Sequence, residues 1–416
     1  MGGCVRDLHL GRTPGDWDVT TSALPEETMA VFGTAAFPTG LKHGTVTVKT
    51  EEGTVEVTTY RRDGSYLDHR RPETVEFTAS LKEDLLRRDF TINAMAMDLR
   101  GEVCDLYHGL QDLELGILRC VGDAEQRLEE DALRILRGLR FAACIGLQIE
   151  PGTTTAIHAK KDLLRQIAAE RIWVEVAKLL TGGDAVRILR EYVDVFGVFW
   201  PELLDMVGVD QKNKHHIFDI WEHTLHAMTY TERDLTLRCA VLLHDVGKPR
   251  CMTADEEGVG HFYGHPEVGQ EIADELLRRL KVDNATRETV TRLVAWHDRD
   301  IPRTDRGVRR ALRALGEQDL RRLLAVKKAD NLAQAPEYHT IQREIDKAEQ
   351  ILDHLIERDA CVTLKQLAVS GRDLMELGAS GPTVGRGLNQ LLDAVVDGVV
   401  ENEKETLLKY YQTMER

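Results

Sequence analysis

The pattern of apolar residues changes once along this chain, near residues 115 to 120, and this change limits the folds it can adopt. Before it, valines alternate with polar residues at Thr45–Lys49 and at Thr54–Thr59, and Glu51-Glu52-Gly53 lies between the two runs. Alternation with a period of two predicts a β-hairpin. From about residue 120 onward, apolar residues recur at spacings of three and four, as in Glu129–Ala143, which predicts helices. The sequence therefore predicts an α+β protein with a small mixed-sheet head and an all-α body.

Composition excludes several classes of protein. The 416 residues include 54 Lys and Arg against 70 Asp and Glu, so the net charge is −16. No run of 18 apolar residues is present, and we expect no membrane partner. Seven cysteines without a Cys-x-x-Cys pair argue against a disulfide framework and are typical of a reducing cytoplasm, the location we expect. The acidic balance excludes a general nucleic-acid coat but permits local basic grooves.

The first twenty residues contain a candidate phosphate and metal site. Gly2 and Gly3 allow backbone amides to approach a phosphate closely, and Arg6 adds charge-assisted hydrogen bonds. Asp16 and Asp18 are two residues apart, so on a strand both side chains point to one face. Paired carboxylates suit Mg²⁺, which binds through one or two carboxylates together with substrate phosphates. The alternative is a turn with exposed aspartates.

A third candidate carboxylate is Glu56, which lies between Val55 and Val57 on a predicted strand. The valines face one side of the strand and Glu56 faces the other. Three carboxylates could hold two metal ions for an in-line attack on a phosphate. The alternative is an ordinary glutamate on the solvent face of a strand.

The segment Arg87–Ala94 offers polar groups for phosphate and ribose. Arg88, Asp89 and Asn93 supply a guanidinium, a carboxylate and an amide within six residues. Taken alone, the segment is equally typical of a helix start with a solvated charge pair.

A polar stripe runs through Glu130–Arg140, which we expect to be helical. The stripe is formed by Asp131, Arg134, Arg137 and Arg140, which are spaced by three, with Leu133 off it. Aspartate only accepts hydrogen bonds and arginine only donates them. Cytosine and adenine present an amino donor beside a ring-nitrogen acceptor, so one Asp and one Arg can select these bases without a template. The alternative is a salt-bridged exposed face.

The order of these motifs resembles the class II tRNA nucleotidyltransferases, a family that includes the bacterial CCA-adding enzymes and the related poly(A) polymerases. The resemblance rests on residues 2–23, 87–96, 105–113 and 130–142 and on Glu170-Arg171. It covers about the first 180 residues. Members of this family carry a helix and a strand before the di-glycine, so we expect this head to lack one element of its sheet.

The resemblance implies a function and a role for each candidate residue. Asp16 and Asp18 would bind catalytic Mg²⁺, Gly3, Arg6 and Arg88 would contact the nucleotide, and Asp131 and Arg134 would read its base, with Arg137 and Arg140 beside it. The reaction implied is attack by the 3′-hydroxyl of tRNA on the α-phosphate of CTP or ATP, with release of pyrophosphate. Partners are therefore the tRNA 3′ end, CTP and ATP, and not DNA. The loop Arg62–Pro72 resembles one that full CCA-adding enzymes have.

A second set of ligand-type residues lies between residues 205 and 335. A histidine, then a His-Asp pair, then two further histidines and an aspartate follow one another along this segment. Imidazoles and carboxylates together suit a divalent metal, and the segment resembles the HD phosphohydrolase domain. That resemblance implies a metal such as Mg, Mn, Ni or Fe, bound by His223, His244, Asp245 and Asp330. It also implies a possible second metal at His265 and His297.

We therefore expect four parts: a catalytic head (1–115), a helical nucleotide-reading neck (116–204), an HD domain (205–335) and a helical tRNA-binding tail (336–416). The leading hypothesis is a template-independent CCA-adding transferase. One alternative is an A-adding or poly(A) polymerase relative. Others are an HD phosphohydrolase with an inert head and a non-catalytic RNA-binding scaffold.

Overall fold

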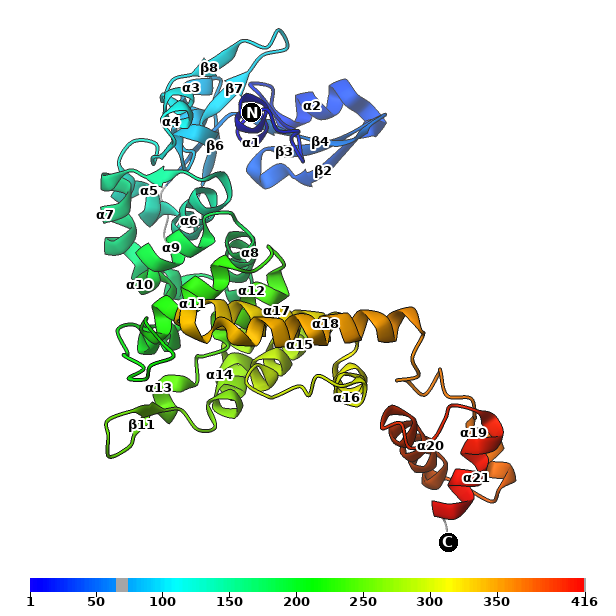
Figure 1. Ribbon diagram of the computed structural model, residues 1–416. Helices are drawn as coiled ribbons and strands as arrows, with labels where there is room; N and C mark the ends of the chain where they lie inside the picture. The colour runs from blue at the N-terminus through cyan, green and yellow to red at the C-terminus, as the bar shows by residue number, and fades with distance from the viewer. Residues whose placement is uncertain (65–73, 415–416) are drawn as a thin grey trace. The chain divides into compact units, whose positions relative to one another are not determined.

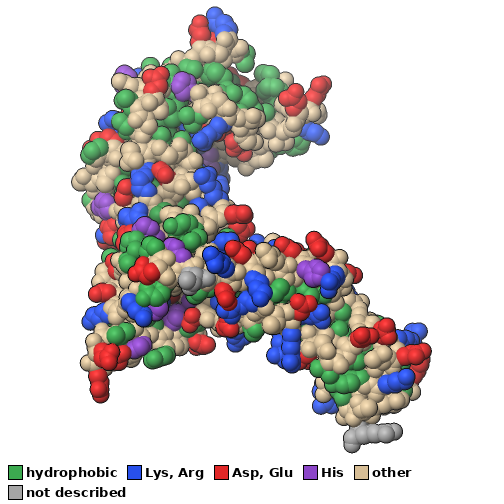
Figure 2. Space-filling model, viewed as in Figure 1, with side chains coloured by type: hydrophobic (Ala, Val, Ile, Leu, Met, Phe, Trp, Pro, Cys, Tyr) green, Lys and Arg blue, Asp and Glu red, His purple; other side chains and the backbone are tan. Residues whose placement is uncertain are grey.

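The computed structural model describes residues 1–64 and 74–414. It divides into two compact units, which are considered separately: a first unit of residues 1–204 and 279–282, and a second unit of residues 205–278 and 283–416 (Figure 1). Much of the predicted loop Arg62–Pro72 lies outside the described residues. Every helix in the described ranges is too short or too polar to cross a bilayer. Acidic and basic side chains are interspersed on the face seen in Figure 2.

A four-stranded sheet in the order β1-β4-β3-β2 forms the head of the first unit. Its strands are β1 (Asp18–Thr21), β2 (Ala36–Gly40), β3 (Thr45–Thr50) and β4 (Gly53–Thr59). β3 and β4 form the predicted antiparallel hairpin, with Val46 opposite Val57 and Val48 opposite Val55. β1 runs parallel to β4 at the edge of the sheet. The alternating valines therefore form the sheet they predicted.

One face of this sheet is covered by α2 (Pro25–Phe32). Val46, Val48 and Val57 form a buried cluster, against which Met29 of α2 and Ala36 pack. At the other end of the sheet, the terminal amine of Met1 donates to the carbonyl oxygen of Asp18 at 2.5 Å. This bond fixes the start of α1 (Gly3–His9) beside β1. The expected additional sheet element before residue 2 stays a prediction.

The remaining elements of the first unit are short ladders and helices. The ladders are β5 (Arg61–Asp63) with β6 (Val75–Phe77), β7 (Met95–Met97) with β8 (Val103–Asp105), and β9 (Ile117–Leu118) with β10 (Gln148–Ile149). The helices are α3 (Leu81–Leu86), α4 (Gly109–Glu114), α5 (Ala124–Glu130), α6 (Leu133–Ile145), α7 (Pro151–Lys160), α8 (Ala169–Leu180), α9 (Ala185–Glu191) and α10 (Val193–Phe196). Short 3-10 turns are η1 (Gly33–Ala35), η2 (Leu41–His43), η3 (Thr91–Asn93), η4 (Lys161–Gln166) and η5 (Pro201–Met206).

α6 lies at the centre of the first unit and packs against α8. Its apolar side chains Ile135, Leu136 and Leu139 are at most 1% exposed. Gly138 lets the helix approach the ring of Phe90, since a Cβ atom there would lie 2.9 Å from Phe90 Cζ. The polar face of α6 is thereby held at a fixed distance from the segment that contains Arg88, Asp89 and Asn93.

The second unit is helical apart from the hairpin β11 (Thr253–Ala254) and β12 (Gly260–His261). Its helices are α11 (Ile220–Thr229), α12 (Leu235–Leu243), α13 (Lys248–Cys251), α14 (His265–Arg279), α15 (Asn284–Trp296), α16 (Asp305–Leu315), α17 (Glu317–Leu332), η6 (Pro336–Ile341), α18 (Gln342–Glu357), α19 (Gly371–Glu376), α20 (Pro382–Val396) and α21 (Lys404–Met414). Helices α19 to α21 enclose their own apolar cluster, which includes Leu374, Leu391 and Tyr411. The predicted α+β head and all-α body are confirmed.

Candidate functional site

A cavity of about 490 Å³ in the first unit collects all the predicted nucleotide-binding residues and the two predicted metal-binding aspartates. Its walls come from α1, the start of β1, the segment around η3, and α6. The predicted residues that line it are Gly3, Arg6, Asp16, Asp18, Arg88, Asp89, Asn93, Asp131, Arg134, Arg137 and Arg140. Motifs far apart in the sequence therefore meet around one space.

Two carboxylates stand at this cavity without a protein partner. Asp18 is the first residue of β1, Asp16 lies in the turn before it, and both are exposed. Within residues 1–64 and 74–414, neither carboxylate forms a hydrogen bond or an ion pair. Glu56 is opposite Asp18 in the parallel register of β1 and β4, but it does not line the cavity. Its role as a third metal ligand stays a prediction.

Two buried arginine nitrogens in the cavity wall have no hydrogen-bond acceptor. They are Nε of Arg88 and Nη1 of Arg171. Burial lowers the pKa of Arg88, and the neighbouring charge of Arg87 adds to this effect. An unpaired buried donor costs about 1–3 kcal/mol. The two nitrogens therefore suit a ligand that brings oxygen acceptors, as a phosphate does.

A chain of side-chain hydrogen bonds joins α1 to α6 across the cavity. Nη1 of Arg6 donates to Oδ1 of Asn93 at 2.6 Å, and Nδ2 of Asn93 donates to Oδ1 of Asp89 at 3.1 Å. The other oxygen of Asp89 lies 2.7 Å from Nη2 of Arg137. Asp89 and Asn93 thus hold two arginines in place as well as lining the cavity.

The charge of Asp89 is fixed by these partners. Burial alone would raise the pKa of its carboxyl group, because the side chain is 7% exposed. Arg137 and the Asn93 amide favour the ionised form, and together they hold that pKa well below its ordinary value. Asp89 therefore remains a carboxylate, and Arg137 keeps its ion pair, at neutral pH.

Phe141 is a cavity residue that the motif analysis missed. The guanidinium carbons of Arg6, Arg137 and Arg140 lie 4.9, 5.5 and 4.0 Å from the centroid of its ring. An aromatic face attracts cations, so one buried ring gathers three positive charges at the cavity. A signal was present in the sequence, because Phe141 follows Arg137 by one helical turn. Leu133, which we expected off the polar stripe, also lines the cavity.

The prediction of a continuous helix through Glu130–Arg140 is wrong at its beginning. α5 ends at Glu130, Asp131 has an extended backbone (φ −138°, ψ 104°), and α6 begins at Leu133. The physical reason is that Oδ1 of Asp131 accepts a hydrogen bond from the Leu133 amide at 3.1 Å and so competes with a continuing helix. Its Oδ2 lies 3.5 Å from Nη2 of Arg171. Burial raises the pKa of Asp131, and Arg171 opposes that effect.

The arginines that follow Asp131 do not form a solvated face. Arg134 is 8% exposed, and its Nη1 donates to Glu130 at 2.7 Å. Arg140 donates to Glu175 at 2.5 Å. With the Arg137 pair described above, each guanidinium in the stripe is oriented by an acceptor. The cavity therefore has a preorganised cationic wall.

The second unit gathers the six predicted metal ligands from five segments. α11 supplies one histidine, the residues after α12 supply the His-Asp pair, the beginning of α14 and the end of α15 supply one histidine each, and α17 supplies an aspartate. These ligands are His223, His244, Asp245, His265, His297 and Asp330. Two sets of three have ligand atoms within 4.8 Å of one another: His223 with His244 and Asp245, and Asp245 with His265 and His297. Asp245 belongs to both.

The histidine hydrogen bonds show which ring nitrogen faces the centre. Nδ1 of His244, His265 and His297 lies 2.7, 2.8 and 2.7 Å from a carbonyl oxygen three residues earlier. Because a carbonyl only accepts, each Nδ1 carries the proton, and in a neutral ring Nε2 has a free lone pair. Metal-binding histidines are commonly oriented by such a bond. Asp330 completes the group, with Oδ1 2.8 Å from Nε2 of His223.

Two of these lone pairs face each other. Nε2 of His265 lies 3.1 Å from Nε2 of His297, and the two atoms lie 3.5 and 3.7 Å from Oδ1 of Asp245. Two unprotonated nitrogens at this distance repel unless a cation or a proton lies between them. On the other side, Nε2 of His244 is buried and lies 3.2 Å from Oδ2 of Asp245. The donor set therefore fits one or two divalent cations.

Lys248 belongs to the same cluster and was missed by the motif analysis. Its Nζ lies 2.7 Å from Oδ2 of Asp245 and donates to Gln211 at 2.9 Å. The side chain also lines a cavity of about 460 Å³ that opens on Asp245, His265 and His297. A cation beside the ligands can contact an anionic substrate. Its position three residues after Asp245 is the signal that could have identified it.

Three family models match successive parts of the chain. The poly A polymerase head domain matches residues 1–119. The "Probable RNA and SrmB-binding site of polymerase A" matches residues 146–203. The tRNA nucleotidyltransferase domain 2 matches residues 261–411.

Whole-chain comparisons find similar proteins named CCA-adding enzyme. The chain is 34% identical to that of Geobacillus kaustophilus over 421 aligned residues, which cover 100% of this chain and 92% of the relative. It is 44% identical to that of Oceanobacillus iheyensis, but this alignment covers 52% of the chain and 53% of the relative. A solved structure of the Bacillus stearothermophilus CCA-adding enzyme in complex with CTP has a TM-score of 0.73 and 32% identity, and it covers 100% of this chain and 92% of that one.

The Asp89–Arg137 pair predicts a pH-dependent contribution to stability. Asp89→Asn should lower the free energy of unfolding at pH 7 by about 2 kcal/mol, since a hydrogen bond to a charged group is lost. The pKa of Asp89 in the folded protein lies below its ordinary value of 3.8. The ion pair therefore contributes its full stability at pH values above 3.8, where Asp89 is ionised in both states. This stability is lost as the pH falls from there through the folded pKa. Urea unfolding of both proteins between pH 7 and pH 3 measures the difference.

The difference in unfolding free energy should narrow below about pH 4, where Asp89 is protonated in the unfolded chain. Other titrating groups are common to both proteins and cancel. A difference that is the same at pH 7 and pH 3 would contradict an ionised, paired Asp89.

Proposed function

The chain belongs to the CCA-adding enzyme family, and from that membership we propose that it adds CCA to the 3′ end of tRNA. It is a nucleotidyltransferase that uses CTP and ATP and releases pyrophosphate, with no nucleic-acid template. An enzyme that acts on tRNA works in the bacterial cytoplasm, and we propose the same location here.

One observation carries this proposal beyond family membership. The cavity of the first unit sets two unpartnered carboxylates, Asp16 and Asp18, against a wall of guanidinium groups. Unpaired donors at Arg88 and Arg171 in the same wall suit a triphosphate. Carboxylates alone would repel a nucleotide, and arginines alone would bind it without activating it. A metal–nucleotide complex satisfies both sides of the cavity.

Asp16 and Asp18 would hold the divalent metal, for which we propose Mg²⁺. The metal would polarise the α-phosphate and lower the pKa of the attacking hydroxyl. The protein would supply position and charge: Arg6 and Arg88 would orient the phosphates, and Gly3 would let the backbone approach them. Most of the rate enhancement would come from this positioning and electrostatic stabilisation.

The base would be read at the junction of α5 and α6. Asp131 offers an acceptor at the cavity, and Arg134, held by Glu130, offers a donor at a fixed place. Cytosine and adenine match that polarity on their Watson–Crick edges, whereas uracil and guanine present the reverse. Arg137 and Arg140 line the same wall, and the Phe141 ring holds both of them.

The first experiment is extension of a tRNA that ends at the discriminator base, with CTP alone, ATP alone, or both. The wild type should add CC from CTP and complete CCA only when ATP is present. Addition of adenosine without prior CTP would favour the A-adding relative instead.

Asp16→Ala and Asp18→Ala should each reduce extension to background while the helical second unit stays folded. The reason is the loss of a ligand for the metal at the α-phosphate. Glu56→Ala tests the third predicted ligand, because Glu56 neighbours Asp18 but lies outside the cavity lining: near-normal extension would exclude it from the metal site, and loss of extension would place it there. Near-normal extension by either aspartate variant, measured on denaturing gels, would remove the two-carboxylate assignment.

A second activity is favoured by the histidine cluster of the second unit. We propose that His223, His244, Asp245 and Asp330 hold one divalent ion and that His265 and His297, with Asp245, hold another. The supporting observation is the 3.1 Å approach of the Nε2 atoms of His265 and His297 beside the buried Asp245, while the Nδ1 atom of each ring lies against a carbonyl oxygen. When bound, such ions supply a water-derived nucleophile for phosphate ester hydrolysis. Lys248 would contact the phosphate. The metal would be Mg, Mn, Ni or Fe.

The double variant His265→Ala and His297→Ala should lose one bound metal ion per chain, and His244→Ala should lose the other. CCA addition should persist in both, because the nucleotide cavity is in the first unit. Metal content is measured by mass spectrometry after dialysis against each metal. His226→Ala is the matched control, since His226 stacks on Phe218 at 4.0 Å and is in neither ligand set. Unchanged metal content would show that these histidines are structural.

A further inference from the structure

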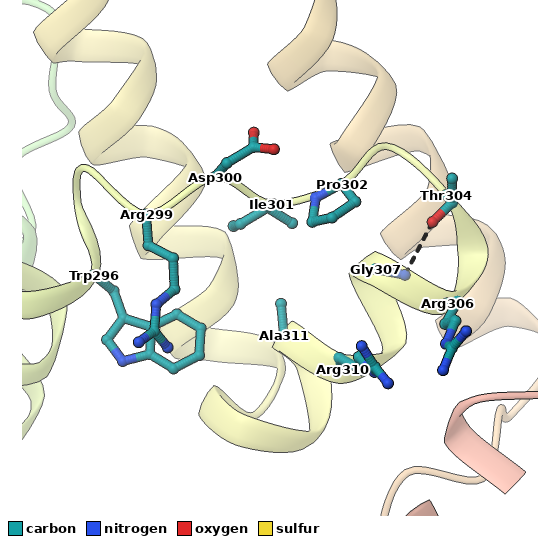
Figure 3. Close-up of a pocket in the computed structure, with 10 residues that line it drawn as sticks. All are labelled: Trp296, Arg299, Asp300, Ile301, Pro302, Thr304, Arg306, Gly307, Arg310 and Ala311. Atoms are coloured by element: carbon teal, nitrogen blue, oxygen red, sulfur yellow. Dashed lines mark hydrogen bonds between the residues drawn. The ribbon is translucent and has the colours of Figure 1, made fainter. Parts of the chain in front are cut away.

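The second unit contains a separate cavity of about 370 Å³ between the end of α15 and the beginning of α16 (Figure 3). Its lining is largely apolar, from Ile301, Pro302 and Ala311, while Trp296 forms one side. Gly307 permits this shape, because a Cβ atom there would lie 2.2 Å from the carbonyl oxygen of Pro302. Its volume falls in the range that holds one small planar group.

Arg299 offers an uncommitted cationic plane inside this cavity. Its guanidinium carbon lies 4.3 Å from the ring centroid of Trp296, and Figure 3 shows the two side chains overlapping. Within the described ranges, its guanidinium forms no hydrogen bond or ion pair. An arginine plane and an indole are the surfaces on which unpaired nucleobases stack.

Two more arginines at the rim share one counter-charge. Nε and Nη2 of Arg306 and of Arg310 all donate to Asp397, at 2.6 to 3.2 Å. One carboxylate therefore neutralises half of their charge. The Nη1 group of each meets no acceptor among the residues that the structure describes. In Figure 3 the Asp300 carboxylate points away from these arginines.

The arginines of α16 form a local concentration of positive charge in an acidic protein. The protein has a net charge of −16, so a polyanion binds only where basic groups are concentrated. α16 alone carries four arginines, at positions 306, 309, 310 and 313, and Figure 2 shows Lys and Arg side chains over it. A stacking surface next to guanidinium groups that can contact phosphates is the arrangement found in single-strand RNA sites.

We propose that this cavity and the arginines of α16 form an RNA-binding site, in which an unpaired base stacks on Arg299 and the adjoining backbone phosphates contact Arg306 and Arg310. The inference rests on the proposed function, because tRNA is then the RNA that is bound. In the free protein, Asp397 at the end of α20 occupies part of the phosphate position. RNA phosphates would compete with it.

A purely structural role makes a different prediction. The same ion pairs, together with Arg313 and Asp393, could serve only to hold α16 against α20. Removing either partner would then loosen the contact equally. If the arginines bind phosphate, removing the carboxylate frees them, and removing the guanidinium groups eliminates the contact.

The test compares Arg306→Gln/Arg310→Gln with Asp397→Asn. Binding of fluorescently labelled tRNA lacking CCA is measured by anisotropy between 50 and 300 mM salt, and melting curves confirm that each variant is folded. The arginine double variant should bind about tenfold or more weakly, and its slope of log Kd against log salt should fall by about two. Asp397→Asn should bind as tightly as the wild type or more tightly. Arg299→Gln should weaken binding with a smaller change of slope.

Equal weakening by the arginine and aspartate variants, or an unchanged salt slope in all of them, would overturn the proposal in favour of a structural contact. Unchanged affinity in every variant would overturn it as well. Failure of the wild type to bind tRNA at all would instead count against the proposed function, so the two failures are distinguishable.

Discussion

The ion pair between Asp89 and Arg137 is the interaction on which the cavity of the first unit depends. It joins the segment after α3 to the middle of α6, two parts of the chain that are 48 residues apart. Through Asn93 it also fixes Arg6 on α1. Three guanidinium groups then converge on Phe141, where their mutual repulsion is offset by Asp89, Glu175 and the aromatic ring. A cavity with this much oriented positive charge suits a polyphosphate.

In the second unit, the buried carboxylate of Asp245 joins separate segments of the chain, as Asp89 does in the first unit. Asp245 lies between two sets of histidines, and three of these histidines, His244, His265 and His297, are each oriented by a carbonyl of their own segment. The ligands come from helix ends as well as from within α11 and α17, where packed helices hold side chains precisely enough for a metal. The two candidate sites lie in different units, so the residues of one can be substituted without changing those of the other.

Much of this could be predicted from the sequence, and the exceptions have physical causes. Period-two valines identified the hairpin because a one-residue shift would expose every valine. The Asp131 break was not predicted because a periodic pattern cannot show that a side chain accepts a hydrogen bond from the backbone amide two residues later. Phe141 and Lys248 were missed although each has a partner nearby in its own segment, because the contacts that complete their surroundings, with Arg6 and Gln211, come from other segments. Glu56 was placed correctly on its strand, but a strand pattern does not show whether a side chain reaches a cavity.

The central claim is that side-chain polarity in the cavity replaces a template. Asp131→Asn tests it most directly, because asparagine can still accept the hydrogen bond from the Leu133 amide and keeps the size of the side chain, but it offers a donor as well as an acceptor. Single-turnover extension with CTP and with UTP gives the ratio of incorporation. The account predicts that this ratio falls by about tenfold to a hundredfold, corresponding to about 1–3 kcal/mol for one buried polar match. A ratio equal to that of the wild type would contradict it.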